Sequence, residues 1–127
     1  MARIPTYRMM PQRRKGSKYG NRRVEADGHT FDSVKEMNRY MDLKFLLLAG
    51  EIQCLELQKP FELQPAFRDK NGKWHQAVRY ICDFYYFDKQ KDEWVIEDVK
   101  SPATANNGVY KLKKKMMLYK GLEITEV

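Results

Sequence analysis

The segment Tyr80–Pro102, YICDFYYFDKQKDEWVIEDVKSP, places charged residues inside two strands that otherwise consist of apolar residues. Its aromatic and aliphatic runs predict two strands, and the polar DKQKDE between them predicts a hairpin turn. The charged residues are Asp83 in the first strand, and Asp98 and Lys100 in the second. Because a buried charge is costly unless it is paired or binds a metal ion, we expect these three residues to have a specific role.

The spacing of these charges predicts that they meet on one side of the hairpin. A turn centred on the middle of DKQKDE places Asp83 opposite Asp98, with Cβ atoms about 4.5–5.5 Å apart. Side chains alternate along a strand, so Asp98 and Lys100 share a face and Glu97 points to the other. Adjacent carboxylates repel unless one takes a proton or a cation binds between them. Mg²⁺ suits such a pair, and a structural ion pair near a strand end is the alternative.

The chain before this hairpin predicts one helix followed by strands. Ser33 and Glu36 have the spacing of a capping box, and Gly50 is typical of a helix end, so we expect a helix from about Ser33 to about Ala49. The dipeptide Asp27-Gly28 predicts a turn just before this helix. CLELQ and PFELQPAF each predict a short strand after it, and DKNGK predicts a hairpin turn.

The chain after the hairpin predicts a loop, a second helix and a last strand. SPATANNG has the composition of a polar, mobile loop. VYKLKKKMMLYKG predicts a helix whose core-facing residues are Val109, Leu112, Met116 and Tyr119, with Lys111, Lys114 and Lys115 outward. LEITEV is the last strand. The order helix, strands, helix, strand predicts a mixed α/β domain.

The net charge of +7 is concentrated at the N-terminus. Residues 1–23 contain eight Lys or Arg residues and no acid, so they carry +8 and leave −1 for the rest of the chain. We predict a mobile basic arm at residues 1–24 and a folded domain at 25–127. Such an arm suits a nucleic acid, although it can also serve solubility alone.

The basic residues predicted to contact nucleic acid lie in the arm and on the second helix. Those on the helix are also compatible with a solvated face. The predicted set is Arg13, Arg14, Lys15, Lys18, Arg22, Arg23, Lys113 and Lys115.

Several classes of protein are disfavoured. The longest apolar run, Phe45–Ala49, is too short for a bilayer, and no secretory signal is recognisable, so we expect a cytoplasmic protein with no membrane partner. Two cysteines do not make a disulfide framework, and they lack the close ligand pairs of a zinc site.

Asp83, followed after fourteen residues by Asp98-Val99-Lys100, resembles the PD-(D/E)xK nuclease superfamily. The similarity extends over about Lys18–Lys120 to a family of small phage-encoded proteins described as resolvase-like or endonuclease-like. The segments that carry it are KYGNRRVEADGHTFDSVKEMNRYMDL, GEIQCLELQKPFEL, YICDFYYFD, WVIEDVKS and VYKLKKKMM.

The resemblance implies a restriction-endonuclease-like core with a central mixed sheet, and it assigns roles to residues. Asp83 and Asp98 would bind Mg²⁺ or Mn²⁺, the Val99 carbonyl would be a third ligand, and Lys100 would be the catalytic lysine. Glu36 would bind the ion directly or through water, unless it only caps its helix. Cys82 stands where some members have proline, and the triplet begins with Asp rather than the commoner Glu, so Glu97 is a rival ligand.

The function implied is that of a metal-dependent endodeoxyribonuclease, acting on branched DNA such as Holliday junctions. Its setting would be the cytoplasm of a phage-infected or prophage-carrying bacterium. One chain would have one site, so cutting both strands of a duplex needs a homodimer or two events. The alternative is a non-catalytic nucleic-acid-binding module, or a phage replication or recombination accessory protein, that retains the nuclease fold.

Overall fold

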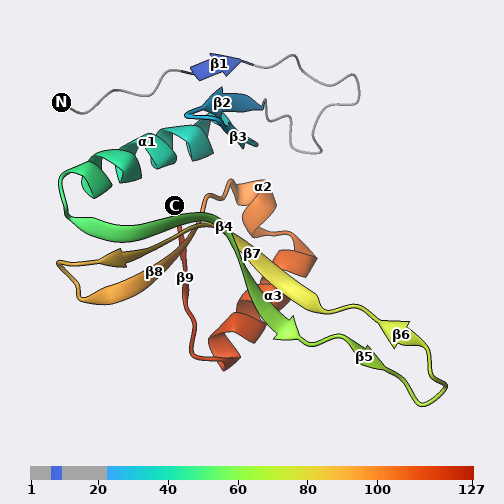
Figure 1. The fold of residues 1–127 in the computed structure, drawn as a ribbon. Helices are drawn as coiled ribbons and strands as arrows, with labels where there is room; N and C mark the ends of the chain where they lie inside the picture. Colours follow the sequence, from blue (N-terminus) through green and yellow to red (C-terminus); the bar gives the residue numbers. More distant parts are fainter. Residues whose placement is uncertain (1–6, 10–22) are drawn as a thin grey trace. The chain divides into compact units, whose positions relative to one another are not determined.

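The fold is mixed α/β, as the sequence predicts, with short strands, a helix, further strands, two helices and a last strand in that order (Figure 1). The computed structural model describes the backbone of residues 7–9 and all of residues 23–127. The elements are β1 (Tyr7–Met9), β2 (Val24–Ala26), β3 (His29–Phe31), α1 (Val34–Leu48), β4 (Ile52–Gln64), β5 (Phe67–Arg68), β6 (Trp74–His75), β7 (Val78–Asp88), β8 (Glu93–Asp98), α2 (Pro102–Ala105), α3 (Gly108–Tyr119) and β9 (Ile124–Glu126).

Contacts divide the chain into two compact units. The first contains Met1–Leu55 and Phe87–Glu93, and the second contains Glu56–Tyr86 and Trp94–Val127. The first unit carries the antiparallel sheet β1-β2-β3 and helix α1. The second unit carries most of the four-stranded sheet, the β5–β6 hairpin, α2 and α3.

The predicted turn at Asp27-Gly28 is confirmed in the first unit. Ala26 pairs with His29, so the loop has two residues, and both have positive φ, 52° for Asp27 and 77° for Gly28. This geometry matches a tight turn to the twist of the strands. The Tyr40 hydroxyl of α1 donates a hydrogen bond of 2.9 Å to Asp27 Oδ2. Burial, together with that bond, raises the pKa of Tyr40 to about 12.

Helix α1 has the bounds expected from its caps. The Ser33 side chain accepts a hydrogen bond from the Glu36 N–H at 3.1 Å. At the other end, the N–H groups of Gly50 and Glu51 donate to the carbonyls of Leu47 and Leu46, which is a Schellman motif. Gly50 has a φ of 77°, which explains the glycine there.

Strand β1 was not predicted, because residues 1–24 were expected to form a mobile arm without regular structure. Tyr7–Met9 pair antiparallel with β2, from Tyr7 opposite Ala26 to Met9 opposite Val24. A strand can join another through backbone hydrogen bonds alone, without apolar residues at regular spacing. The pairing of β1 with β2 therefore leaves no periodic pattern in the sequence.

The four-stranded sheet has the order β4-β7-β8-β9, and β8 pairs with β9 in parallel (Figure 1). Strand β7 ends at Asp88 and strand β8 begins at Glu93, so the turn lies where the hairpin prediction requires it. The core of the second unit lies between this sheet and α3. Its buried members are Leu63, Tyr80, Cys82, Ile96, Tyr110, Met117 and Ile124.

Strand β4 is one strand of 13 residues, where the sequence predicted two short ones. The apolar alternation that defines a strand is interrupted because Gln53 and Cys54 are both exposed. Cys54 has a φ of 56° and Gln58 a φ of 54°, which is the left-handed conformation found in some β-bulges. A bulge shifts the side-chain alternation without ending the strand, so the pattern looks like two segments.

The predicted polar loop SPATANNG contains the short helix α2, so its prediction as a loop is wrong for Pro102–Ala105. Ser101 and Thr104 form a capping box, and Pro102 occupies the first turn. Asn107 then caps α3, and its side chain accepts a hydrogen bond from the Tyr110 N–H at 3.1 Å. These local bonds stabilise helical turns that composition alone does not predict.

The core-facing side of α3 differs from the prediction. Met116 packs against the core as predicted, and Tyr110 and Met117 are buried. The other three predicted residues are exposed: Val109, Leu112 and Tyr119. The helix carries apolar residues on more than one side, and the sequence could not show which side the sheet covers. Among residues 7–9 and 23–127, no helix is both long and apolar enough to cross a bilayer.

Candidate active site

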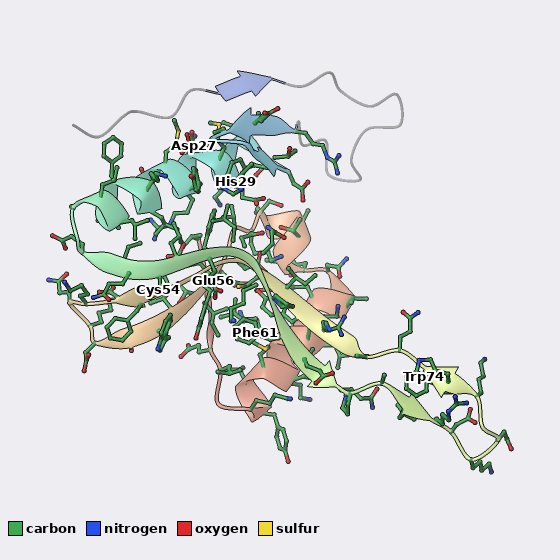
Figure 2. All side chains as sticks on the ribbon, in the orientation of Figure 1. Asp27, His29, Cys54, Glu56, Phe61 and Trp74 are labelled. Carbon is green, nitrogen blue, oxygen red and sulfur yellow. The ribbon has the colours of Figure 1, made fainter. Side chains whose placement is uncertain are left out.

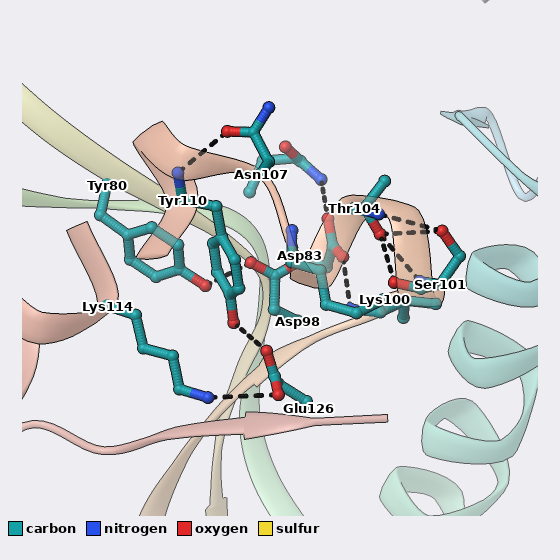
Figure 3. Close-up of polar contacts among 12 residues, drawn as sticks. Tyr80, Asp83, Asp98, Lys100, Ser101, Thr104, Asn107, Tyr110, Lys114 and Glu126 are labelled. Carbon is teal, nitrogen blue, oxygen red and sulfur yellow. Dashed lines mark hydrogen bonds and ion pairs between the residues drawn. The ribbon is translucent and has the colours of Figure 1, made fainter. Parts of the chain in front are cut away.

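Asp83, in the middle of β7, meets the end of β8, where Asp98 is the last residue of the strand and Lys100 follows it (Figure 3). The N–H of Val99 donates a hydrogen bond of 2.8 Å to Asp83 Oδ2. The Asp83 carboxylate therefore lies against the peptide that joins Asp98 to Val99. Asp83 Oδ1 accepts a second, longer hydrogen bond of 3.3 Å from the Gln58 side chain on β4.

The alternation of strand β7 helps to place Asp83. Tyr80 and Cys82 belong to the core between sheet and helix α3. Tyr80, Cys82, Phe84 and Tyr86 are all buried, whereas Asp83 is only half-buried. Because side chains alternate along a strand, Asp83 lies on the side of β7 opposite Cys82 and Phe84.

The Asp98 carboxylate is buried, with 4% of the residue exposed, and both of its oxygens are engaged. Oδ1 lies 3.1 Å from the Lys100 Nζ, and Oδ2 accepts a hydrogen bond of 2.5 Å from the Tyr80 hydroxyl. Burial raises the pKa of Tyr80 above its usual range, and the bond to Asp98 adds to the effect. Tyr80 therefore remains a protonated donor to Asp98 at any pH that the fold tolerates.

Lys100 is held from two sides. Its Nζ lies 4.0 Å from the centroid of the Tyr110 ring as well as 3.1 Å from Asp98 Oδ1. The Lys100 side chain is 18% exposed, so part of it reaches solvent. An ammonium over an aromatic face gains an electrostatic attraction that strengthens as water is excluded.

Glu126 and Lys114 extend this arrangement, and sequence reasoning did not select either for the site. Glu126 on β9 pairs with Asp98 in the parallel register. Its Oε2 accepts a hydrogen bond of 2.7 Å from the Tyr110 hydroxyl, and its Oε1 lies 3.2 Å from the Lys114 Nζ. Those contacts, first the Tyr110 bond and then Lys114, lower the pKa of Glu126. The only signal in the sequence was an acid in a terminal strand.

The rival acid Glu97 has a different partner. It is almost completely buried, and its carboxylate accepts a hydrogen bond from the Tyr86 hydroxyl. Asp98, the next residue, is bonded instead to Tyr80 and Lys100. Glu36 belongs to the first compact unit, where it lies buried in the first turn of α1. A role for either acid in binding a metal ion stays a prediction.

The donor chemistry around Asp83 and Asp98 suits a hard cation. Asp83 accepts a hydrogen bond from the Val99 N–H, Asp98 is the residue before Val99, and the Val99 carbonyl is a further oxygen donor. Within residues 23–127, no three His, Cys, Asp or Glu side chains are gathered as a ready ligand set. Mg²⁺ commonly uses one or two carboxylates and completes its shell with water and substrate phosphate, so the two acids fit that requirement.

The predicted DNA-contacting residues are only partly covered by the structure. Arg13, Arg14, Lys15, Lys18 and Arg22 lie outside the described residues. Arg23 is described, and its Nε lies 3.7 Å from Asp32 Oδ1. Lys113 and Lys115 both lie on α3, but residues two apart on a helix do not share a face. Lys111 and Lys115, four apart and both exposed, form the better matched pair.

The comparisons with known proteins identify a family and no activity. No curated protein and no solved structure matches the chain. The model of the family described as "Protein of unknown function (DUF1064)" matches residues 16–127. Because this match spans most of the chain, the protein belongs to the DUF1064 family.

Proposed function

We propose that the protein is a metal-dependent endodeoxyribonuclease with a restriction-endonuclease-like core. The observation that carries the proposal is the Asp83 carboxylate on the peptide that follows Asp98, with Lys100 on Asp98 itself. Two acids from adjacent strands and a lysine just after the second strand thus lie close together. This is the chemistry expected of the Asp83 and Asp98-Val99-Lys100 pattern.

Asp83, Asp98 and the Val99 carbonyl would hold Mg²⁺ or Mn²⁺. Such an ion, when bound, lowers the pKa of a coordinated water and stabilises negative charge on a phosphate oxygen. Asp83 and Asp98 contribute the negative charge that makes this position favourable for a divalent cation. The Val99 N–H holds the Asp83 carboxylate beside the peptide that follows Asp98, while a bound ion would share the Asp98 carboxylate with Lys100 and Tyr80.

Lys100 would act on the phosphate and on the attacking water. Its side chain is partly exposed, whereas Asp98, with which it pairs, is buried. A phosphodiester can therefore approach Lys100 from solvent while Asp98 and Tyr110 hold the ammonium in place. A positive charge fixed in this way stabilises the charge that develops on the phosphate during hydrolysis.

Cleavage of labelled DNA tests the proposal. Duplex, single-stranded and four-way-junction DNA are incubated with the protein in Mg²⁺, in Mn²⁺ and in EDTA, with Lys100→Ala in parallel. We expect metal-dependent cutting that Lys100→Ala loses by at least about 100-fold, the scale of one lost electrostatic donor. Lys91→Ala, which removes an exposed lysine in the turn before β8, serves as the matched control and should cut normally.

The competing function is binding without catalysis. In that case all three DNA forms bind and none is cut in either metal, and Asp83→Ala leaves binding intact. A salt-sensitive preference for RNA over DNA, again without cutting, would favour an RNA-binding or replication accessory protein. Branched DNA as the preferred substrate, and a homodimer that cuts both strands, rest on the family resemblance, and the junction substrate tests the first of these.

The basic N-terminal segment would bind the DNA backbone without reading sequence. Because β1 lies within this segment, charge neutralisation is a cleaner test than deletion. Changing Arg13, Arg14, Lys15 and Lys18 to Gln should weaken DNA binding at low salt. It should also reduce the slope of log K against log salt concentration, by at most the amount expected for about four lost phosphate contacts. Unchanged binding and slope would remove the segment from the mechanism.

A further inference from the structure

The β5–β6 hairpin presents aromatic and basic residues away from the core of the second unit. The hairpin leads from the end of β4 to the start of β7, and Trp74 lies on it (Figures 1 and 2). Trp74 is 56% exposed and Phe67 is 41% exposed. Arg68, Lys70 and Lys73 accompany them, with Asp69 as the one acid between Phe67 and His75. None of these residues belongs to the core cluster of the unit.

The hairpin turn is tightly organised. Phe67 pairs with His75 and Arg68 with Trp74, while the Asp69 N–H donates to the Lys73 carbonyl at 2.9 Å. Asp69 Oδ1 accepts hydrogen bonds from the N–H groups of Asn71 and Lys73. Gly72 has a φ of 81°, which a three-residue loop of this type requires. The loop therefore keeps one shape without support from a core.

The side chains of the hairpin are ordered by contacts with one another. The Phe67 and His75 rings stack at 4.9 Å, and His75 Nε2 lies 2.9 Å from Asp69 Oδ2. The bond to His75, followed by the backbone bonds, lowers the pKa of Asp69. The Arg68 guanidinium lies 5.4 Å from the Trp74 ring centroid, and its Nη1 donates to the Gly72 carbonyl at 3.1 Å.

These contacts hold a large aromatic ring at the surface among cations. A single exposed tryptophan needs no explanation, and a bare two-stranded hairpin is marginally stable in water. Here Arg68, Lys70 and Lys73 outnumber Asp69, so three cations and one acid leave the hairpin with a net positive charge. An exposed aromatic ring with cations beside it is the combination that binds single-stranded nucleic acid.

We propose that the β5–β6 hairpin binds unpaired nucleotides of DNA, with a base stacked on Trp74 and phosphates on Arg68, Lys70 and Lys73. The inference requires no catalysis. Where the proposed function holds, the hairpin also sets the distance from an unpaired base to the cut. Asp83 follows His75 by eight residues in the same stretch of chain, at most about 26 Å in an extended strand.

The fluorescence of Trp74 provides a direct test. The chain has two tryptophans, so Trp94→Phe makes Trp74 the sole reporter and keeps a ring beside Tyr85, on which Trp94 stacks. The full chain carrying this change is titrated in EDTA with an oligo(dT) strand and with a blunt duplex of equal length. We expect quenching of Trp74 emission by the single strand and at least threefold less quenching by the duplex. No change at saturating single strand would overturn the proposal, and so would equal quenching by both.

Affinity measured by anisotropy of a labelled oligo(dT) strand gives the second readout. Trp74→Ala should weaken binding by about 5- to 100-fold, the range of one lost base stack. Trp74→Phe should restore most of it. Tyr119→Ala, which removes a 93% exposed aromatic residue from α3, is the matched control and should bind normally. Trp74→Ala binding within twofold of the parent would refute the role of Trp74. Because EDTA prevents any cutting, these results are independent of whether the nuclease activity exists.

Discussion

The Lys100 ammonium lies 4.0 Å from the centroid of the Tyr110 ring and 3.1 Å from Asp98 Oδ1. Tyr110 comes from α3, whereas Lys100 and Asp98 come from the end of β8 and the residues after it. The ring and the carboxylate together restrict a side chain that would otherwise have many rotamers. Tyr110 is therefore a positioning residue for Lys100, through its ring, and for Glu126, through its hydroxyl.

Substitution of Tyr110 should separate these two contributions. Tyr110→Phe keeps the ring under the ammonium, and we expect its metal-dependent cleavage to stay within about threefold of the parent. Tyr110→Leu removes the cation–π contact, worth about 1–2 kcal/mol in a partly desolvated site, and should slow cleavage by about 5- to 30-fold. Single-turnover rates measured across pH provide the test, because a purely structural role would lower stability without changing the pH profile. Equal rates for the two variants would contradict the assignment.

Asp98 and Glu97 should differ in what their loss affects. Asp98→Asn removes the charge that faces Lys100, so cleavage should fall by at least about 100-fold while DNA still binds. Glu97→Gln keeps an acceptor for the Tyr86 hydroxyl and should retain cleavage. Glu97→Ala leaves that buried hydroxyl without this partner and should cost about 1–3 kcal/mol of unfolding free energy. Cleavage assays and urea unfolding measure these effects. Loss of cutting in Glu97→Gln would make Glu97 the metal ligand instead.

Glu126 should contribute stability that depends on pH. Its pKa is lowered in the fold, so the unfolded chain binds the proton more tightly. The contribution is fully present above the unfolded pKa of about 4.3 and is lost as pH falls through the lower, folded pKa. Its size should be at most about 1 kcal/mol, because the ion pair with Lys114 is partly exposed.

Thermal unfolding of Glu126→Gln tests this dependence. The melting temperature of the variant should be lower than that of the parent at pH 6–8, and the gap should shrink below about pH 4.3. Glu123→Gln, a change at an exposed acid just before β9, controls for the general loss of one negative charge. A gap that stays constant from pH 7 to pH 3 would show that ionisation of Glu126 is not the source.

The orientation of α3 has a simple test in stability. Met117 is completely buried, so Met117→Ala should cost about 2–5 kcal/mol through lost contacts and a residual cavity. Leu112 is 59% exposed, and Leu112→Ala should change the unfolding free energy by about 0.5 kcal/mol or less. Chemical denaturation of both variants provides the measurement. A larger loss for Leu112→Ala would mean that the other side of the helix faces the core.

Local chemistry in the sequence was sufficient for several elements of the fold. Ser33 and Gly50 determined the two ends of α1, because capping bonds form between residues only three to five apart. Asp27-Gly28 determined a two-residue turn, because both positions need positive φ. The strands on either side of DKQKDE followed from alternation, and Asp83 was singled out because a charge in such a strand needs a partner.

Only the tertiary structure decided which residues surround those charges. Glu126 reaches Asp98 through a parallel pairing that must cross over by way of α3, so no short-range pattern links them. Tyr110 reaches Lys100 because the sheet covers one of two apolar sides of α3, and the sequence made both look equally suitable. The sequence determined the local elements, since turns and caps depend on a few neighbouring residues. The tertiary structure determined the site, since packing brings together residues that are far apart in the chain.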